Sequence, residues 1–166
     1  MREQLSSRTN RRIASYVTIC TTQKIDKKTR ELSKLFPAHS LLNKTNFMSL
    51  KSFLKKIKNN EAVSFTESIQ VITESYHYQP VEFSNGIGDK KLTNAQGTNE
   101  GSCKIFSFAK INQLNQQQTL CLFGDFYRKD VMEDPTGNGH QNIRNFMQFG
   151  WEGISFTEQA LTEKTL

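Results

Sequence analysis

The chain has 166 residues, a moderate apolar share and a net charge of +6. One domain is the default at this length, and the lack of a run of about eighteen apolar residues excludes a membrane-spanning helix. Residues 1–47 hold ten Lys and Arg against three Asp and Glu, leaving +7, whereas residues 48–166 hold twelve against thirteen, leaving −1. The basic character belongs to the first segment, so it does not predict nucleic-acid binding by the rest.

Residues 1–47 are rich in Arg, Ser, Thr and Lys and have no long amphipathic pattern. This composition is typical of a segment that is disordered on its own. Three origins fit it: a start placed too far upstream, with Met48 as the true initiator; an organellar transit peptide; or a flexible secretion leader. We favour the first and then the second. The sequence thus predicts a basic disordered leader, 1–47, before a domain, 48–166.

The cysteines are Cys20, Cys103 and Cys121, an odd number without close spacing. This pattern predicts neither a disulfide framework nor a cysteine-based metal site. We therefore expect a reduced, cytoplasmic protein with no metal and no cofactor, unless the leader directs it to an organelle or a secretion apparatus. The oligomeric state is left open.

From Ser49 onward, helical patterns are clear. Apolar residues recur at the spacing of one helix face: Leu50, Phe53, Leu54 and Ile57. Ser64 and Glu67 then have the spacing of a capping box. The apolar stripe that follows extends to Tyr76, and Pro80 ends it. We expect two helices here, with their lysines facing solvent.

Residues 80–98 are rich in turn-forming residues, including Asn85-Gly86. They predict a loop with a short β-hairpin around 81–93. Residues 103–111 fit either a buried helix or a strand, because their apolar run satisfies both patterns. We favour the helix.

Asn115 with Gln118 gives another cap pairing, and apolar residues continue at helical spacing to residue 131. A last main helix is expected from about 140 to 149, and the tail from Thr157 is expected to add one helical turn. The fold class predicted is mostly α: a single compact domain of about five helices. Antiparallel and globin-like packing both remain open.

One hypothesis for chemistry pairs the thiol of Cys103 with the imidazole of His140, with Asn142 or Glu100 orienting the ring. A thiol at a helix start would have a lowered pKa and higher reactivity. The simpler interpretation, which we favour, makes Cys103 a small buried hydrophobe and His140 a polar residue of a helix start.

A second hypothesis is an anion pocket between two helix starts, where backbone amides and the helix dipole attract negative charge. Its candidate ligand-binding residues are Glu100, Ser102, Lys104, His140 and Arg144. We favour instead a structural network in which Arg144 pairs with Glu100, Asp125 or Asp130. Trp151 is a further candidate, as an exposed recognition aromatic, although a lone Trp between glycines more often fills the core.

Two ordered blocks of sequence carry a family resemblance. They are 99–109 continuing to 119–128, and 140–147 closed by Gly150-Trp151 and 154–156. These blocks resemble the HopJ type III effector family, over nearly everything from Met48 to Phe156. The family is named for proteins that plant-pathogenic bacteria deliver through a type III secretion apparatus, and relatives also occur in other organisms.

The resemblance implies an effector-like protein-interaction domain, with a host protein as partner if the chain is secreted. It implies no established activity and no catalytic residues, so whether the protein is an enzyme stays open. The alternative is an intracellular housekeeping protein, bacterial or algal, that binds or converts a small anionic ligand. That ligand would use the Glu100–Lys104 and His140–Arg144 region.

Overall fold

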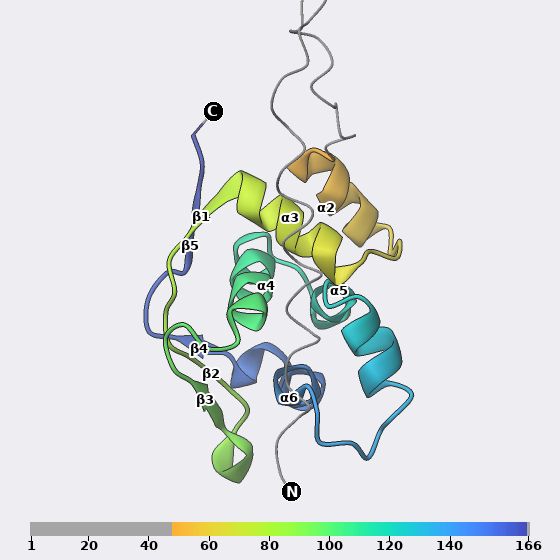
Figure 1. The fold of residues 1–166 in the computed structure, drawn as a ribbon, viewed down its shortest axis with the longest axis vertical. Coiled ribbons are helices and arrows are strands. Elements are labelled where there is room, and N and C mark those ends of the chain that lie inside the picture. Colours follow the sequence, from red (N-terminus) through yellow and green to blue (C-terminus); the bar gives the residue numbers. More distant parts are fainter. Residues whose placement is uncertain (1–47, 166) are drawn as a thin grey trace, which may run out of the picture. The chain divides into compact units, whose positions relative to one another are not determined.

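Helices and short strands alternate through the described part of the chain, residues 48–165 of the computed structural model (Figure 1). The predictions for residues 1–47 lie outside this part. In chain order the elements are α2 (Leu50–Lys58), α3 (Phe65–Ser75), β1 (Tyr76–Tyr78), β2 (Phe83–Asn85), η1 (Gly88–Lys90), β3 (Leu92–Asn94), α4 (Glu100–Ile111), α5 (Gln116–Cys121), η2 (Phe126–Val131), α6 (Gln141–Phe149), η3 (Gly150–Gly153), β4 (Ser155–Phe156) and β5 (Leu161–Glu163).

Three of the helices begin on side-chain caps. The Ser49 hydroxyl accepts the amide of Ser52 at the start of α2. Ser64 caps α3 and Asn115 caps α5, each in a complete capping box. Each cap satisfies an amide that would otherwise lack an acceptor in the first turn. The two capping boxes predicted from residue spacing are therefore confirmed.

The strands form two small antiparallel sheets. β1 pairs with β5, with Tyr76 opposite Glu163, and β2 pairs with both β3 and β4. The hairpin expected around 81–93 is confirmed by the β2–β3 pair. The helical turn expected after Thr157 is wrong, because this segment leads into β5, whose partner strand lies far away in the sequence. The fold is mostly α, as predicted, and it also contains small sheets.

The helix expected from Asn115 to Val131 is interrupted. α5 ends at Cys121, and Gly124 adopts a φ of +61°, which ends right-handed helical geometry. A Cβ at Gly124 would lie 2.5 Å from the Phe65 amide nitrogen, so the close approach to α3 requires glycine. The chain continues as the π-helical segment η2, whose local pattern resembles an α-helix in sequence.

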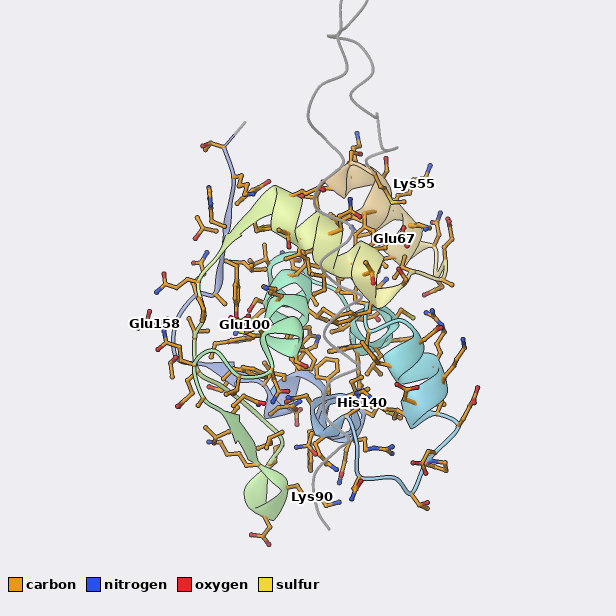
Figure 2. All side chains as sticks on the ribbon, viewed as in Figure 1. Lys55, Glu67, Lys90, Glu100, His140 and Glu158 are labelled. Atoms are coloured by element: carbon orange, nitrogen blue, oxygen red, sulfur yellow. The ribbon has the colours of Figure 1, made fainter. Side chains whose placement is uncertain are left out.

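Helix α4 occupies the centre of the fold, between the strands and helices α3 and α5 (Figure 1). The favoured helical interpretation of residues 103–111 is confirmed. Phe106 of α4 is fully buried, and its ring centroid lies 5.3 Å from that of Phe123 and 4.8 Å from that of Phe146. Charged side chains such as Lys55 and Lys90 project outward (Figure 2). α4 thereby fixes where the surface pockets next to it lie.

Candidate functional site

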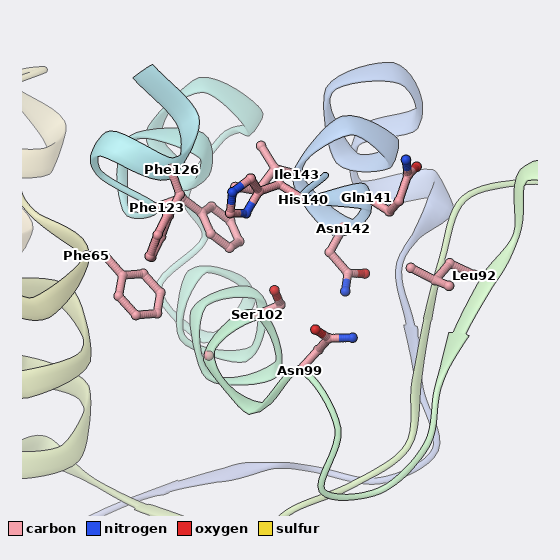
Figure 3. Close-up of a pocket in the computed structure, with 11 residues that line it drawn as sticks. Phe65, Leu92, Asn99, Ser102, Phe123, Phe126, His140, Gln141, Asn142 and Ile143 are labelled. Carbon is pink, nitrogen blue, oxygen red and sulfur yellow. The ribbon is translucent and has the colours of Figure 1, made fainter. Parts of the chain in front are cut away.

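A pocket of about 500 Å³ lies between the N-termini of α4 and α6 (Figure 3). One wall is aromatic and comes from Phe65, Phe123 and Phe126, while amide and hydroxyl side chains form the other. The polar lining residues are Asn99, Ser102, His140, Gln141 and Asn142. Among the described residues that line this pocket there is no Lys or Arg.

Both helices begin on an unusual residue. Asn99 and His140 are the N-cap residues of α4 and α6, both have φ near +50°, and neither side chain caps its helix. Positive φ is uncommon outside glycine, although Asn and His tolerate it better than most residues. The first-turn amides of both helices therefore receive no acceptor from their own cap, in contrast to α2, α3 and α5.

Buried asparagines meet beside the pocket, and Asn142 is the one that also lines it. Asn142 donates to Asn94 Oδ1 at 2.8 Å, and its own Oδ1 accepts from Asn94 at 3.1 Å. Asn85 Nδ2 donates to the Asn142 carbonyl at 2.6 Å. Asn145 Nδ2 donates to the carbonyls of Asn85 and Lys90 at 2.9 and 2.8 Å. These amides, which we term the asparagine cluster (Asn85, Asn94, Asn142 and Asn145), hold the β2–β3 hairpin against α6.

The cluster also explains the start of α4. Asn99 Nδ2 donates to Asn94 Oδ1 at 2.7 Å, so the side chain is turned toward the cluster. Gly86 is part of the same arrangement: at its φ of +108° a Cβ would lie 2.3 Å from the Lys90 oxygen that Asn145 binds. Among the fully buried side-chain nitrogen and oxygen atoms of the cluster in the described chain, only Asn85 Oδ1 has no hydrogen-bond partner.

His140 lies at the edge of the pocket. Its Nε2 is 3.2 Å from Asp130 Oδ2, and its ring lies against Phe126 with 5.2 Å between centroids. Both contacts come from η2. The imidazole is therefore held at the aromatic wall by a carboxylate and a phenyl ring.

The Cys103 thiol lies in the core and is almost completely buried. Burial raises its pKa, and hydrogen bonding by Tyr78, the Val81 backbone and Ser107 offsets this only partly. The sequence hypothesis required a lowered pKa, so the direction is opposite to the expected one. His140 is not among the groups that act on this thiol. Burial also raises the pKa of the Tyr78 hydroxyl.

Of the remaining candidates, the structure brings Ser102 and Asn142 to the pocket with His140. Lys104 places its Nζ 4.3 Å from the Tyr78 ring centroid. Arg144 donates through Nε to the Gly139 carbonyl at 2.7 Å and so stabilises the turn before α6. The ion pairs expected for Arg144 with Glu100, Asp125 or Asp130 do not form among the described residues.

Trp151 lies away from the pocket. Its indole Nε1 donates to the Leu114 carbonyl at 3.0 Å, and its ring meets Phe146 edge-on at 5.1 Å. These contacts match the interpretation of Trp151 as a residue that fills the core.

The asparagine cluster is the feature that sequence reasoning missed. Asn85 and Asn94 were expected in turns, and Asn142 only as a residue orienting His140. The available signal was in α6, where Asn142 and Asn145 stand beside the apolar residues Ile143 and Phe146. Residues next to the apolar positions of a helix lie at the edge of its buried face. Amide side chains there, three residues apart, need hydrogen-bond partners inside the fold.

Taken together, the fold defines a mostly helical domain with small sheets, and the comparisons identify its family. The HopJ type III effector protein model matches residues 50–161, so the chain belongs to this family. The crystal structure of the unknown-function protein VPA0580 is similar, with 45% identity and a TM-score of 0.67; the match covers 70% of this chain and 95% of that one. Among curated proteins, no match was found.

Two further findings concern the part of the chain that the structure describes. None of its helices is long and apolar enough to cross a membrane. Within residues 48–165 there is also no group of three or more His, Cys, Asp or Glu side chains placed to hold a metal ion.

Proposed function

We propose that residues 48–166 act as a protein-interaction domain, in keeping with the effector name of the family, and that a type III apparatus delivers the domain to its partner. The observation that carries the proposal is an exposed pair of methionines, Met132 after η2 and Met147 on α6. Their exposed fractions are 52% and 37%. Methionine is flexible and polarizable, and it is enriched on surfaces that accept varied protein partners.

The two methionines line one hollow. It has a volume of about 410 Å³, and Pro135 and Val131 contribute to it. Met147 also borders an adjoining hollow, of about 480 Å³, with Tyr127 and Leu120. The methionine surface (Tyr127, Met132, Pro135 and Met147) therefore continues along η2 and α6. Apolar side chains of a partner would remove this area from water.

The charges beside the surface indicate the chemistry of the partner. Glu133 and Asp134 directly follow Met132, both are exposed, and neither makes an ion pair with another described residue. Among the described residues, Arg144 is the one charged residue that lines the hollow, and its guanidinium is bound to carbonyls of the turn before α6. A segment with apolar residues flanked by Lys or Arg would complement both the methionines and the carboxylates. We therefore propose a basic, amphipathic segment of a protein as the occupant.

The proposal is tested by introducing charge into the apolar surface. A Met132→Lys, Met147→Lys double variant should lose at least tenfold in affinity for a synthetic basic amphipathic helix, measured by fluorescence anisotropy, because two ammonium groups would occupy the apolar contact and repel the basic peptide. In cross-linking experiments in cells, the double variant should lose the protein partners that the wild type retains.

Ile87→Lys is the matched control, because Ile87 is an exposed apolar residue on another part of the domain, the β2–β3 hairpin. It should keep peptide binding and cross-linked partners. Equal binding by all three proteins, each with an intact thermal transition, would contradict the proposal.

The alternative function, binding or conversion of a small anionic ligand, would use the pocket between α4 and α6. The helix starts and the polar side chains of Ser102 and His140 favour it. The geometry supports it less, because Lys104 and Arg144 are directed elsewhere and His140 already faces the carboxylate of Asp130.

A further inference from the structure

The pocket between α4 and α6 collects free hydrogen-bond donors from two helices. In α4 the first amide with a backbone acceptor is that of Cys103, and in α6 it is that of Ile143. The preceding amides that border the pocket have no acceptor within residues 48–165; they belong to Gly101, Ser102, Gln141 and Asn142. A ligand that offers acceptor oxygens would satisfy them.

The side chain of Asn142 adds a buried donor to these amides. Asn142 is only 5% exposed, and its amide is directed into the space beside Ser102 and Asn99 (Figure 3). An amide nitrogen carries two hydrogens. The reciprocal pair with Asn94 uses one of them, because each Nδ2 donates to the Oδ1 of the other residue. The second hydrogen of Asn142 has no acceptor among the described residues, and a buried donor left unpaired is costly. This indicates that a ligand atom accepts it.

The opposite wall of the pocket offers a flat apolar surface. Phe126 is 40% exposed, although its ring centroid lies 5.0 Å from that of Phe65 and 5.2 Å from that of His140. An exposed aromatic ring that faces hydrogen-bonding groups suits a planar ligand, which can stack on the ring and bond at its edge.

The charges around the pocket favour a neutral ligand. Within the described chain, no Lys or Arg lines it. Glu100 lies in the first turn of α4, and Asp130 contacts His140, the N-cap residue of α6. A carboxylate beside each helix start offsets the positive end of the helix dipole. An anion would therefore gain little here, whereas a neutral carbonyl can still accept from the free amides.

We propose that this pocket binds a planar, neutral cyclic amide of the kind found in a pyrimidine base. Its ring would stack on Phe126, and its carbonyl oxygens would accept from the first-turn amides and from Asn142 Nδ2. A ring N–H would donate to the hydroxyl of Ser102, which lies on the side of α4 that faces α6 (Figure 3). The pocket shares no lining residue with the two hollows of the methionine surface, so the site is independent of the proposed protein interaction.

The test uses the full chain with uracil as the probe. In an NMR titration, uracil should bind and shift the backbone amide resonances of Gly101 and Asn142. Orotate, which is the same ring with a carboxylate, and dihydrouracil, whose ring is puckered, should both bind more weakly. Ser102→Ala should weaken uracil binding about fivefold, the effect of losing one neutral hydrogen bond.

Phe126→Leu should also weaken uracil binding about fivefold, because leucine keeps an apolar side chain but cannot stack. Tyr127→Leu is the matched control, because Tyr127 is the next residue of η2 and does not line the pocket. It should bind uracil as the wild type does.

The proposal would fail if uracil did not bind, or if Ser102→Ala and Phe126→Leu both bound it as tightly as Tyr127→Leu. It would fail equally if orotate bound more tightly than uracil, because the pocket would then be an anion site. If Phe126→Leu lacked a cooperative thermal transition, the comparison of Ser102→Ala with Tyr127→Leu would decide alone.

Discussion

The two ends of α4 differ in how their buried polar groups are arranged. At the N-terminal end, the amides of Asn94, Asn142 and Asn145 bond to one another or to backbone carbonyls and form a network. Along the C-terminal half, the hydroxyl of Ser107 is buried outside any such network, beside the Cys103 thiol. Polar groups that satisfy one another across the fold contribute to its stability, whereas an isolated buried polar group contributes little or costs free energy.

The largest expected effect is at the satisfied end. Asn142→Leu would remove both hydrogen bonds that join the Asn142 amide to Asn94 and the contact that its Oδ1 makes with Asn85. We expect a loss of about 3 kcal/mol in the free energy of unfolding, measured by urea denaturation. Asn138→Ala, at an exposed asparagine in the preceding turn, should change stability by less than about 0.5 kcal/mol.

If Asn142→Leu were as stable as Asn138→Ala, the asparagine cluster would not hold the hairpin to α6. The contrast between the two ends of α4 would then have no energetic basis.

A smaller effect is expected at Gly86, on the hairpin side of the cluster. In Gly86→Ala the new Cβ would collide with the Lys90 carbonyl, and the φ of +108° is unfavourable for alanine. We expect a loss of about 2 kcal/mol or more in the free energy of unfolding. Gly88→Ala is the control, because Gly88 also has positive φ but its Cβ would meet open space.

Backbone strain alone should cost Gly88→Ala about 1 kcal/mol. Equal losses in the two variants would show that the contact with Lys90 contributes nothing beyond backbone conformation.

The smallest effect is a pH dependence at the other end of the comparison, where Cys103 lies one turn before Ser107. Burial holds the pKa of Cys103 above its ordinary 9.0 and that of Tyr78 above 10.0, so the folded chain retains protons that the unfolded chain loses. The contribution of these two groups to the free energy of unfolding should therefore be constant below about pH 8 and fall as pH rises above about 9.

The slope cannot exceed about 1.4 kcal/mol per pH unit for each group, and the half-buried Tyr78 contributes less than this limit. Urea denaturation between pH 7 and 10.5 measures it. Cys103→Ala should reduce the slope between pH 9 and 10, and Cys121→Ala, at a less buried thiol, should not. A slope unaffected by Cys103→Ala would place the titrating group elsewhere.

What the sequence could predict was local. The capping boxes at Ser64 and Asn115 were predictable because the cap and its partner are three residues apart. Strand β5 was not, because its stability comes from Tyr76–Tyr78, a segment distant in sequence. Short strands depend on such partners more than on their own composition.

The candidate site shows the same limit. Helical spacing placed Arg144 one turn after His140, but its guanidinium is bound to carbonyls of the turn before α6, which spacing does not reveal. Asparagines are common in turns and caps, so their role in the core becomes visible only when Asn85 and Asn142 meet across the fold.

The pairing of β1 with β5 and of β2 with β4 has a kinetic consequence. Tyr76 lies opposite Glu163 and Phe83 opposite Phe156, so both sheets require closure of long stretches of chain. Closure of such loops is entropically unfavourable before the contacts form, and it slows folding relative to helical bundles with local contacts. Although helices predominate over strands among the described residues, this domain should fold at the slower rates typical of mixed α/β proteins.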